Sequence, residues 1–320
     1  MSSLLNRREI PIIAFTVVLI FLFSMISSNF FSTNNLGLIL MQITTIGLIS
    51  IGMLMVILMG GIDLSVGSVL AVVATTVGML VNTGINPFLA ALIGLCIGAA
   101  CGAFNGFFIT RFNIPDIITT LATMFIFRGL AVMISGGQWV TNFPTSFNIF
   151  GQGRIVGIPL PIILLIIAAV FFTFLLSYTP FGRVIYAIGG NFDAAKLSGM
   201  NTKRTKFFVY ILSGMLTSVA AIIFASEVGS VQASTAGSGI EFLVIAAVLV
   251  GGASIFGGVG TVLGTMCGVL LIGIIRNGLI VSQASVYWVE ATTGLILLLA
   301  IIFNTVQRNR NLKARGEELV

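Results

Sequence analysis

The sequence contains no histidine among its 320 residues. This absence excludes Ser-His-Asp and Cys-His catalysis, and it excludes metal sites built on imidazole ligands. Cysteine is scarce as well. The three that occur, Cys96, Cys101 and Cys267, lie inside apolar segments and have no metal-ligand spacing. We interpret them as small core residues, and the sequence predicts no metal site and no bound cofactor.

Charge is also scarce, at 8% of residues against 58% hydrophobic residues. Soluble domains usually carry about 25% charged residues. So few polar groups cannot cover a water-soluble globule, and the chain is predicted to be an all-α integral membrane protein. The net charge of +6 comes from basic residues between apolar runs, not interleaved with aromatic residues. We therefore expect no nucleic-acid partner.

Ten apolar segments approach the length of about 20 residues that a bilayer-spanning helix needs. They are 10–31, 36–60, 66–82, 87–110, 116–135, 158–178, 207–226, 241–257, 261–281 and 287–304. The short, glycine-rich segments 66–82 and 241–257 are also compatible with re-entrant structures, so the expected count is about ten, within two. The first segment lacks a cleavage site and is interpreted as a retained anchor.

The basic residues set an orientation if the N-terminus is placed in the cytoplasm and the segments alternate. The residues then placed inside are Arg7, Arg8, Arg111, Arg183, Lys196, Lys203, Arg204, Lys206, Arg308, Arg310, Lys313 and Arg315, whereas Arg154 alone is placed outside. Both termini are therefore predicted to be cytoplasmic. We interpret residues 1–320 as one transmembrane domain with a cytoplasmic loop at 179–206 and a basic cytoplasmic tail at 305–320.

The chain carries no energy source of its own. It lacks the G-x-x-x-x-G-K-[ST] phosphate loop, so an ATP site of the usual kind is excluded. An ion-coupled carrier would need titratable groups at mid-membrane depth, and such carboxylates are few here. An external motor is therefore the favoured interpretation, with an ion-coupled carrier as the alternative. The lack of histidine and of clustered carboxylates argues against a membrane enzyme.

A short helix is predicted in the loop 179–206. Asn191 suits the N-cap, Asp193 the first turn, Lys196 the last turn and Gly199 the C-terminal stop. A rigid helix on the cytoplasmic face can transmit a push from a motor. The alternative is an ordinary polar loop helix.

Several polar residues lie within the apolar segments. Arg276 and Glu290 occupy the outer ends of consecutive segments, so we expect a structural ion pair between them. Arg128 has no evident partner and is left open between a core anchor and a pathway residue. Asn105 and Asn277 follow ladders of glycines, and each is compatible with interhelical hydrogen bonding or with lining a pathway.

Three runs carry a resemblance to a known family. GGIDLSVGS at 60–68, TPFGRVIYAIGGNFDAAKLSG at 179–199 and VLVGGASIFGGVGTVLG at 248–264 resemble the ribose-type permeases of bacterial ABC importers. That family includes ribose, xylose, arabinose, galactose, rhamnose and autoinducer permeases. The resemblance covers roughly residues 10–305 and implies a type II ABC-importer-like permease bundle. Permeases for branched-chain amino acids or nucleosides belong to the same superfamily and stay open as alternatives.

The resemblance also implies partners and residue roles. A second permease subunit, identical or paralogous, a cytoplasmic ATP-binding subunit and an extracytoplasmic sugar-binding protein are expected. The substrate is expected to be a small neutral monosaccharide. The residues implied to contact the ATP-binding subunit belong to the predicted loop helix: Asn191, Asp193, Lys196, Ser198 and Gly199.

Two further groups of residues are assigned on these motifs. In the signature turn, Gly60, Gly61, Asp63 and Ser65, the two polar residues are expected to cap the following helix. In the outer stretch 136–147, Gln138, Trp139, Asn142 and Phe143 fit an external gate that touches sugar. An interfacial aromatic belt or a receptor-docking surface is the alternative for this stretch.

Overall fold

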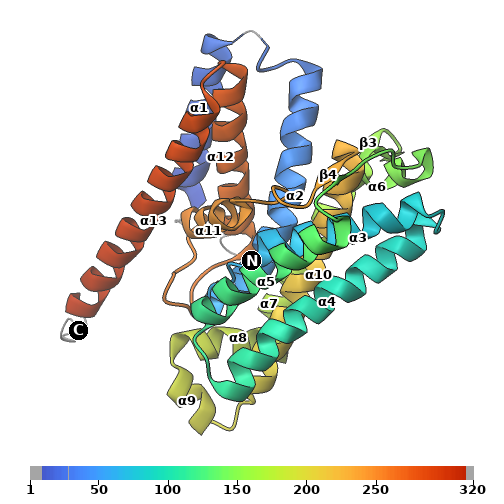
Figure 1. The fold of residues 1–320 in the computed structure, drawn as a ribbon. Helices are drawn as coiled ribbons and strands as arrows, with labels where there is room; N and C mark the ends of the chain where they lie inside the picture. Colours follow the sequence, from blue (N-terminus) through green and yellow to red (C-terminus); the bar gives the residue numbers. More distant parts are fainter. Residues whose placement is uncertain (1–8, 28, 315–320) are drawn as a thin grey trace.

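The structure is a computed structural model that describes residues 9–27 and 29–314, and Figure 1 shows that it consists almost entirely of helices. The α-helices are α1 (Glu9–Ile26), α2 (Thr33–Leu58), α3 (Val66–Asn82), α4 (Pro87–Phe112), α5 (Asp116–Ser135), α6 (Ile149–Gln152), α7 (Leu160–Tyr178), α8 (Pro180–Gly190), α9 (Phe192–Leu197), α10 (Thr202–Val228), α11 (Ile240–Val250), α12 (Val262–Val281) and α13 (Val286–Ala314). Arg7, Arg8 and residues 315–320 of the predicted tail lie outside the described residues.

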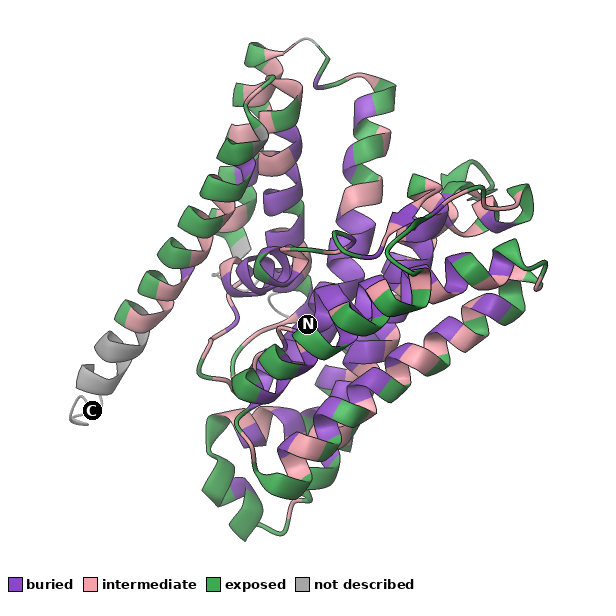
Figure 2. Ribbon diagram, viewed as in Figure 1, coloured by how far each residue is buried: buried purple, intermediate pink, exposed green. Residues whose placement is uncertain are grey.

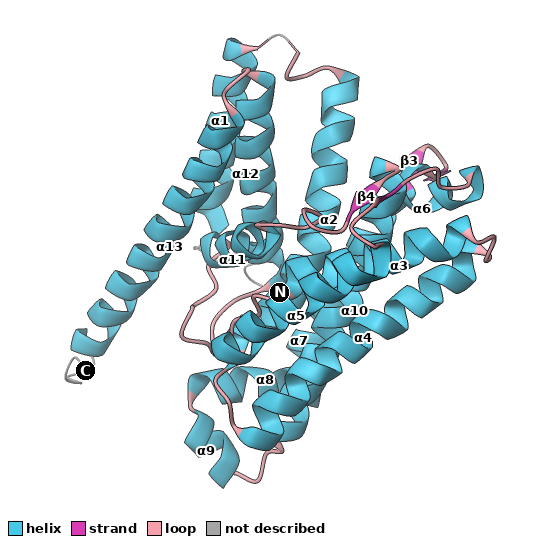
Figure 3. Ribbon diagram, in the orientation of Figure 1, coloured by secondary structure: helices cyan, strands magenta, loops and turns pink. Residues whose placement is uncertain are grey.

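Within residues 9–27 and 29–314, strand structure is confined to four two-residue strands, and Figure 3 shows the strands in magenta beside the cyan helices. They are β1 (Trp139–Val140), β2 (Arg154–Ile155), β3 (Ile158–Pro159) and β4 (Val231–Gln232), and a single 3-10 turn, η1, covers Thr145–Asn148. β1 pairs with β4 and β2 pairs with β3, both antiparallel. The all-α prediction is therefore confirmed, with small strand pairs in the connecting loops.

Each of the ten predicted segments corresponds to one helix. Seven helices of the described chain are long and apolar enough to cross a membrane, and three shorter apolar helices cover Ile10–Ile26, Val66–Asn82 and Ile240–Val250. Two of these three are the segments that the sequence marks as short. The 11 residues of α11 extend only about 16 Å, roughly half of a hydrocarbon core of about 30 Å. α11 is therefore a half-helix.

The helix connections gather at two ends of the bundle. One end, here called the α9 end, brings together the turns after α2, α4 and α11 and the connection that contains α8 and α9, as contacts among Gly61, Asp116, Gly189 and Gly257 show. At the opposite end, Asn82, the last residue of α3, donates a hydrogen bond to the Thr141 carbonyl. The turn after α2 and the end of α3 therefore lie at opposite ends of the bundle.

The core is centred on α2. Every residue of α2 from 43 to 58 is buried, and Figure 2 shows this stretch in purple at the centre of the bundle. By contrast, only 17% of the spanning window of α7 and 11% of that of α13 is buried. Apolar side chains on α7 and α13 are thus the surface that lipid or another subunit covers.

The glycine ladder of α4 packs against α10. A β-carbon at Gly98 would overlap Ser218 Oγ and the Gly214 carbonyl oxygen, and one at Gly102 would overlap the Tyr210 carbonyl oxygen. Backbones this close require glycine, as in other small-residue interfaces between membrane helices. The ladder is a packing device, which is one of the roles that its spacing predicts.

The loop that precedes α11 descends into the bundle. A β-carbon at Gly67 in the first turn of α3 would overlap the Gly237 carbonyl oxygen and touch Glu241 at 2.5 Å. Arg128 on α5 holds this loop, because its Nη1 donates to the Ala233 carbonyl at 3.0 Å and to the Ala236 carbonyl at 2.6 Å. Arg128 is therefore an anchor for the loop, with backbone partners that carry no signature in the sequence.

Candidate coupling and transport site

The three runs that carry the family resemblance meet at the α9 end. In α8, a β-carbon at Gly189 would overlap the Leu58 carbonyl oxygen and the Gly258 nitrogen. The Gly258 N–H donates to the Leu58 carbonyl at 2.9 Å. Tyr186 Oη donates to the Gly260 carbonyl at 2.8 Å. The loop after α11, the end of α2 and α8 therefore form one close-packed backbone junction.

α9 projects from this junction and has the predicted caps. Asn191 Oδ1 accepts a hydrogen bond from the Ala194 N–H at 2.9 Å, so Asn191 is the N-cap. Asp193 lies in the first turn and Lys196 in the last. Ser198 Oγ donates to the Ala194 carbonyl. Gly199 has a φ of +77°, the left-handed conformation that favours glycine after a helix.

The signature turn forms a buried polar chain. The Asp63 carboxylate accepts hydrogen bonds from the Ser65 N–H at 2.9 Å and from Ser65 Oγ at 2.6 Å. Asn105 Nδ2 on α4 donates to Ser65 Oγ at 2.8 Å. Ser65 is the residue before α3, so these bonds hold the signature turn together. Neither the Asp63 nor the Ser65 side chain accepts a hydrogen bond from an N–H within α3, which corrects the expectation that they cap this helix. Asn105 is 1% exposed, so its role here is interhelical hydrogen bonding.

Burial also affects the acidity of the signature turn. Desolvation raises the pKa of Asp63 from 3.8 to about 6, against the opposing effect of its two hydrogen bonds from Ser65, and the charge of Asp116 adds to the rise. The glycines of the turn make room for this arrangement. A β-carbon at Gly61 would overlap the Asp116 carboxylate, and Gly60 has a φ of +78°.

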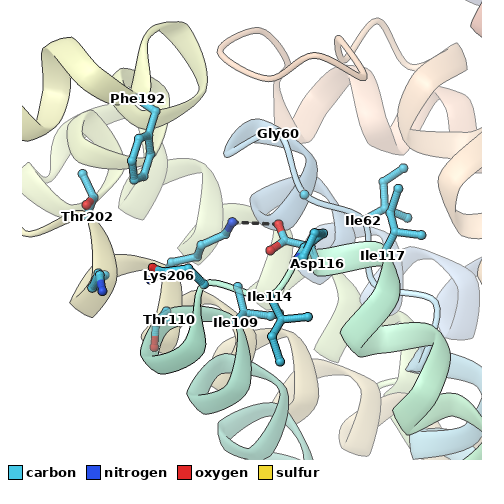
Figure 4. Close-up of a pocket in the computed structure, with 14 residues that line it drawn as sticks. Gly60, Ile62, Ile109, Thr110, Ile114, Asp116, Ile117, Phe192, Thr202 and Lys206 are labelled. Carbon is cyan, nitrogen blue, oxygen red and sulfur yellow. Dashed lines mark ion pairs between the residues drawn. The ribbon is translucent and has the colours of Figure 1, made fainter.

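An ion pair links the turn to the segment that carries α9. Lys206 Nζ on α10 lies 2.8 Å from Asp116 Oδ2 at the start of α5. These two side chains form the one ion pair among the described residues. Figure 4 shows the pair facing a cavity of about 470 Å³ between the signature turn, the α4–α5 turn and the start of α10. Phe192 of α9 lines the same cavity. α9, the start of α10 and the start of α5 therefore border one cavity.

The predicted outer gate lies at the opposite end. Gln138, Trp139 and Asn142 are exposed. Trp139 belongs to β1, opposite Gln232 of β4. Phe143 is half-buried and packs edge-on against Phe147 at 5.4 Å between ring centroids. The Phe143 ring is thus committed to protein packing, whereas the Trp139 ring is free to meet a ligand, a lipid interface or a partner.

The remaining predicted residues lie on α12 and α13. Asn277 and Asn35 exchange two side-chain hydrogen bonds of 2.8 and 2.9 Å, so Asn277 joins α12 to α2. The predicted ion pair of Arg276 with Glu290 is absent, because no nitrogen–oxygen distance between these two described residues is within 4.0 Å. They line one cavity without meeting, since adjacency along the chain does not fix the rotation of two helices.

Three features of the α9 end are not predicted by the sequence reading. α8 (Pro180–Gly190) is a helix with Thr179 as its N-cap, where the reading expects a loop. Leu197 on α9 is 89% exposed, and an apolar residue just before the predicted C-terminal stop at Gly199 is the signal that could have identified it. The Lys206–Asp116 pair spans 90 positions of sequence, and no local pattern predicts such a pair.

The comparisons with known proteins agree with this geometry. The family model described as branched-chain amino acid transport system / permease component matches residues 35–301. The ribose import permease protein of Bacillus subtilis (strain 168) is 41% identical over 289 residues, covering 90% of this chain and 89% of that protein. Its counterpart in Escherichia coli (strain K12) is 39% identical over 290 residues, covering 89% and 90%.

A second group of relatives is named for the import of autoinducer 2. The autoinducer 2 import system permease protein of Yersinia enterocolitica is 34% identical over 312 residues, covering 95% of this chain and 86% of that protein. No solved structure matches the chain significantly. These relatives are transport components and not enzymes, and such permeases work with ATP-binding and substrate-binding partners. The chain belongs to this family of transport-system permeases and, within it, to the ribose-type permeases of ABC importers, as a multi-pass inner-membrane protein.

Proposed function

We propose that this permease imports a monosaccharide, ribose or a similar pentose or hexose, or a furanosyl autoinducer, driven by a separate ATP-binding subunit that docks on α9. The observation that carries the proposal is the junction at the α9 end. α9 stands outside the bundle, yet its own segment reaches α5 through the Lys206–Asp116 pair and reaches α2 through α8. Force applied to α9 therefore has two short routes into the spanning helices.

The docking surface is proposed to combine polar caps with one apolar contact. Asp193, Lys196 and Ser198 lie on the exposed part of α9, and Leu197 adds an apolar side chain that is 89% exposed. An apolar side chain surrounded by polar groups is typical of the anchor in a protein–protein contact. The cavity behind α9 leaves room for the helix to move when the ATP-binding subunit closes.

The orientation is also proposed. The α9 end carries the basic residues of the loop 179–206, so the positive-inside rule puts this end in the cytoplasm. Both chain termini would then be cytoplasmic. The exposed loop with Gln138, Trp139 and Asn142 would face the substrate-binding protein on the other side.

A second permease subunit, identical or paralogous, is proposed to complete the pathway. The apolar surface of α13 favours this proposal, because only 11% of the membrane-spanning window of this helix is buried. A permease for branched-chain amino acids is the rival reading, because the family model carries that description. The two readings predict different substrates for the same complex.

Uptake assays test the proposal. The chain is expressed with its ATP-binding and substrate-binding partners in cells without their own ribose permease, and uptake of labelled D-ribose is measured with excess leucine or autoinducer as competitor. We expect uptake that requires the ATP-binding subunit and is insensitive to leucine. Uptake of leucine, or ribose uptake without the ATP-binding subunit, would contradict the proposal.

Two substitutions, one in α9 and one just after it, refine the test. Asp193→Lys reverses the charge in the first turn, and Gly199→Pro is incompatible with a φ of +77° because proline fixes φ near about −65°. We expect both to abolish uptake while membrane insertion, measured by immunoblot of the membrane fraction, is unchanged. Arg154→Glu, a charge reversal at the opposite end, is the matched control and should retain uptake.

A further inference from the structure

A second large cavity opens between α11, α12 and α13, in the half of the bundle far from α9. Its volume is about 470 Å³, within the range of about 300–1,000 Å³ that is usual for small-molecule sites. The polar residues in its wall are Ser238, Arg276, Glu290 and Thr293, and the ring of Phe242 lies among them. Hydroxyl, carboxylate and guanidinium groups beside an aromatic ring suit a polyol, which both donates and accepts hydrogen bonds.

The two arginines within the apolar segments, Arg128 and Arg276, differ in their hydrogen-bond partners. Arg128 donates two hydrogen bonds to backbone carbonyls of the loop before α11. Arg276 donates none to any described residue, and its Nε is buried without a partner. A buried guanidinium nitrogen without a partner is costly in a protein interior. Arg276 is therefore the group in this wall that most needs a ligand.

Glu290 faces the same cavity without pairing with Arg276. Charged side chains within membrane-spanning segments face the bundle interior or a water-filled cavity, since lipid contact is unfavourable. Two opposite charges that share a cavity but stay more than 4.0 Å apart leave room for a molecule between them. A neutral polyol can accept from the guanidinium and donate to the carboxylate through separate hydroxyls.

We infer that this cavity is a translocation subsite for a monosaccharide, in which Arg276 and Glu290 bind opposite sides of the sugar. The inference rests on the proposed function, because it assigns a place in the bundle to the imported sugar. The subsite accounts for the missing ion pair: Arg276 and Glu290 are held apart in the wall of a cavity that the sugar occupies in transit.

Charge-neutral substitutions test the subsite. In proteoliposomes with the complete importer, ATP and D-ribose as the probe, Arg276→Gln and Glu290→Gln are each expected to lower uptake at least about tenfold, because each removes a hydrogen bond between a charged group and the sugar. Arg154→Gln and Glu227→Gln are matched controls, because these charges lie outside the cavity, and they should retain uptake. Wild-type rates in both cavity variants would overturn the inference.

A second measurement separates binding from folding. No neighbouring atom lies within 4 Å of a β-carbon built at Gly294 in the cavity wall or at Gly37 on α2. In a transport-competent background that lacks the native cysteines, Gly294→Cys and Gly37→Cys are labelled with a bulky thiol reagent. We expect labelling of Gly294→Cys to block uptake and excess D-ribose to slow that labelling, with neither effect at Gly37→Cys. Full uptake after complete labelling of Gly294→Cys would refute the subsite.

Uptake by wild-type proteoliposomes distinguishes failure of the subsite from failure of the proposed function. If wild-type proteoliposomes import D-ribose with ATP but the cavity variants and the labelled protein do so equally well, the subsite is wrong and the proposed function stands. If the wild-type complex imports no monosaccharide, the proposed function fails and the subsite fails with it.

Discussion

Breaking the Lys206–Asp116 ion pair is expected to uncouple the α9 segment from α5. The two charges lie 2.8 Å apart, with side-chain exposures of 22% for Lys206 and 8% for Asp116. At an effective dielectric constant of about 20 the gross attraction is about 6 kcal/mol. Desolvation offsets most of it, so loss of one partner should cost about 2 kcal/mol, between the values for exposed and fully buried pairs.

A double-mutant cycle measures this coupling. Lys206→Met, Asp116→Asn and the double variant are compared for free energy of unfolding in detergent and for ATP-dependent uptake. We expect each single variant to lose about 2 kcal/mol and the double variant to lose less than the sum by about 1–2 kcal/mol. Lys203→Met is the matched control, because Lys203 lines the same cavity and forms no ion pair among the described residues. Additive losses in the cycle, with uptake intact, would refute the mechanical link.

Three further outcomes are expected. Burial raises the pKa of the Asp63 carboxyl from 3.8 to about 6. The folded protein therefore gains stability from binding a proton at Asp63. This gain is complete below pH 3.8 and is lost as the pH rises through 6. Wild-type protein should therefore gain about 1 kcal/mol over Asp63→Asn between pH 7 and pH 5, and an equal response of both proteins in detergent unfolding would count against the buried carboxylate. Gly189→Ala should reduce folded protein in the membrane, whereas Gly190→Ala, with open space around its β-carbon, should not. Finally, Asn35→Leu should destabilise the bundle by about 1–3 kcal/mol by leaving the Asn277 amide unpaired, and an unchanged thermal midpoint would exclude that role.

The sequence predicts the features that local signals determine. The ten segments follow from long apolar runs, and α9 follows from Asn191 at its start and Gly199 at its end, each of which acts within one helical turn. The glycine ladder of α4 likewise predicts close helix packing before any partner is known. These features need only short-range chemistry, so a single amino-acid sequence is sufficient to place them.

The features that the sequence reading misses depend on tertiary arrangement. Arg128 binds backbone carbonyls, and such partners leave no trace in residue identity. Arg276 and Glu290 are close in sequence, but they line one cavity without forming an ion pair. α8 is misread as a loop because its two closing glycines suggest a turn, whereas Gly189 is required by the approach of the Leu58 backbone.

Reconstitution with defined components tests the central claim most directly. The purified chain is placed in proteoliposomes, and accumulation of labelled D-ribose is followed first under an imposed proton or sodium gradient, then after addition of the ATP-binding subunit, the sugar-binding protein and ATP. The account predicts no accumulation by the chain alone and accumulation against a concentration gradient only with both partners and ATP. Accumulation driven by an ion gradient in the absence of the partners would contradict it.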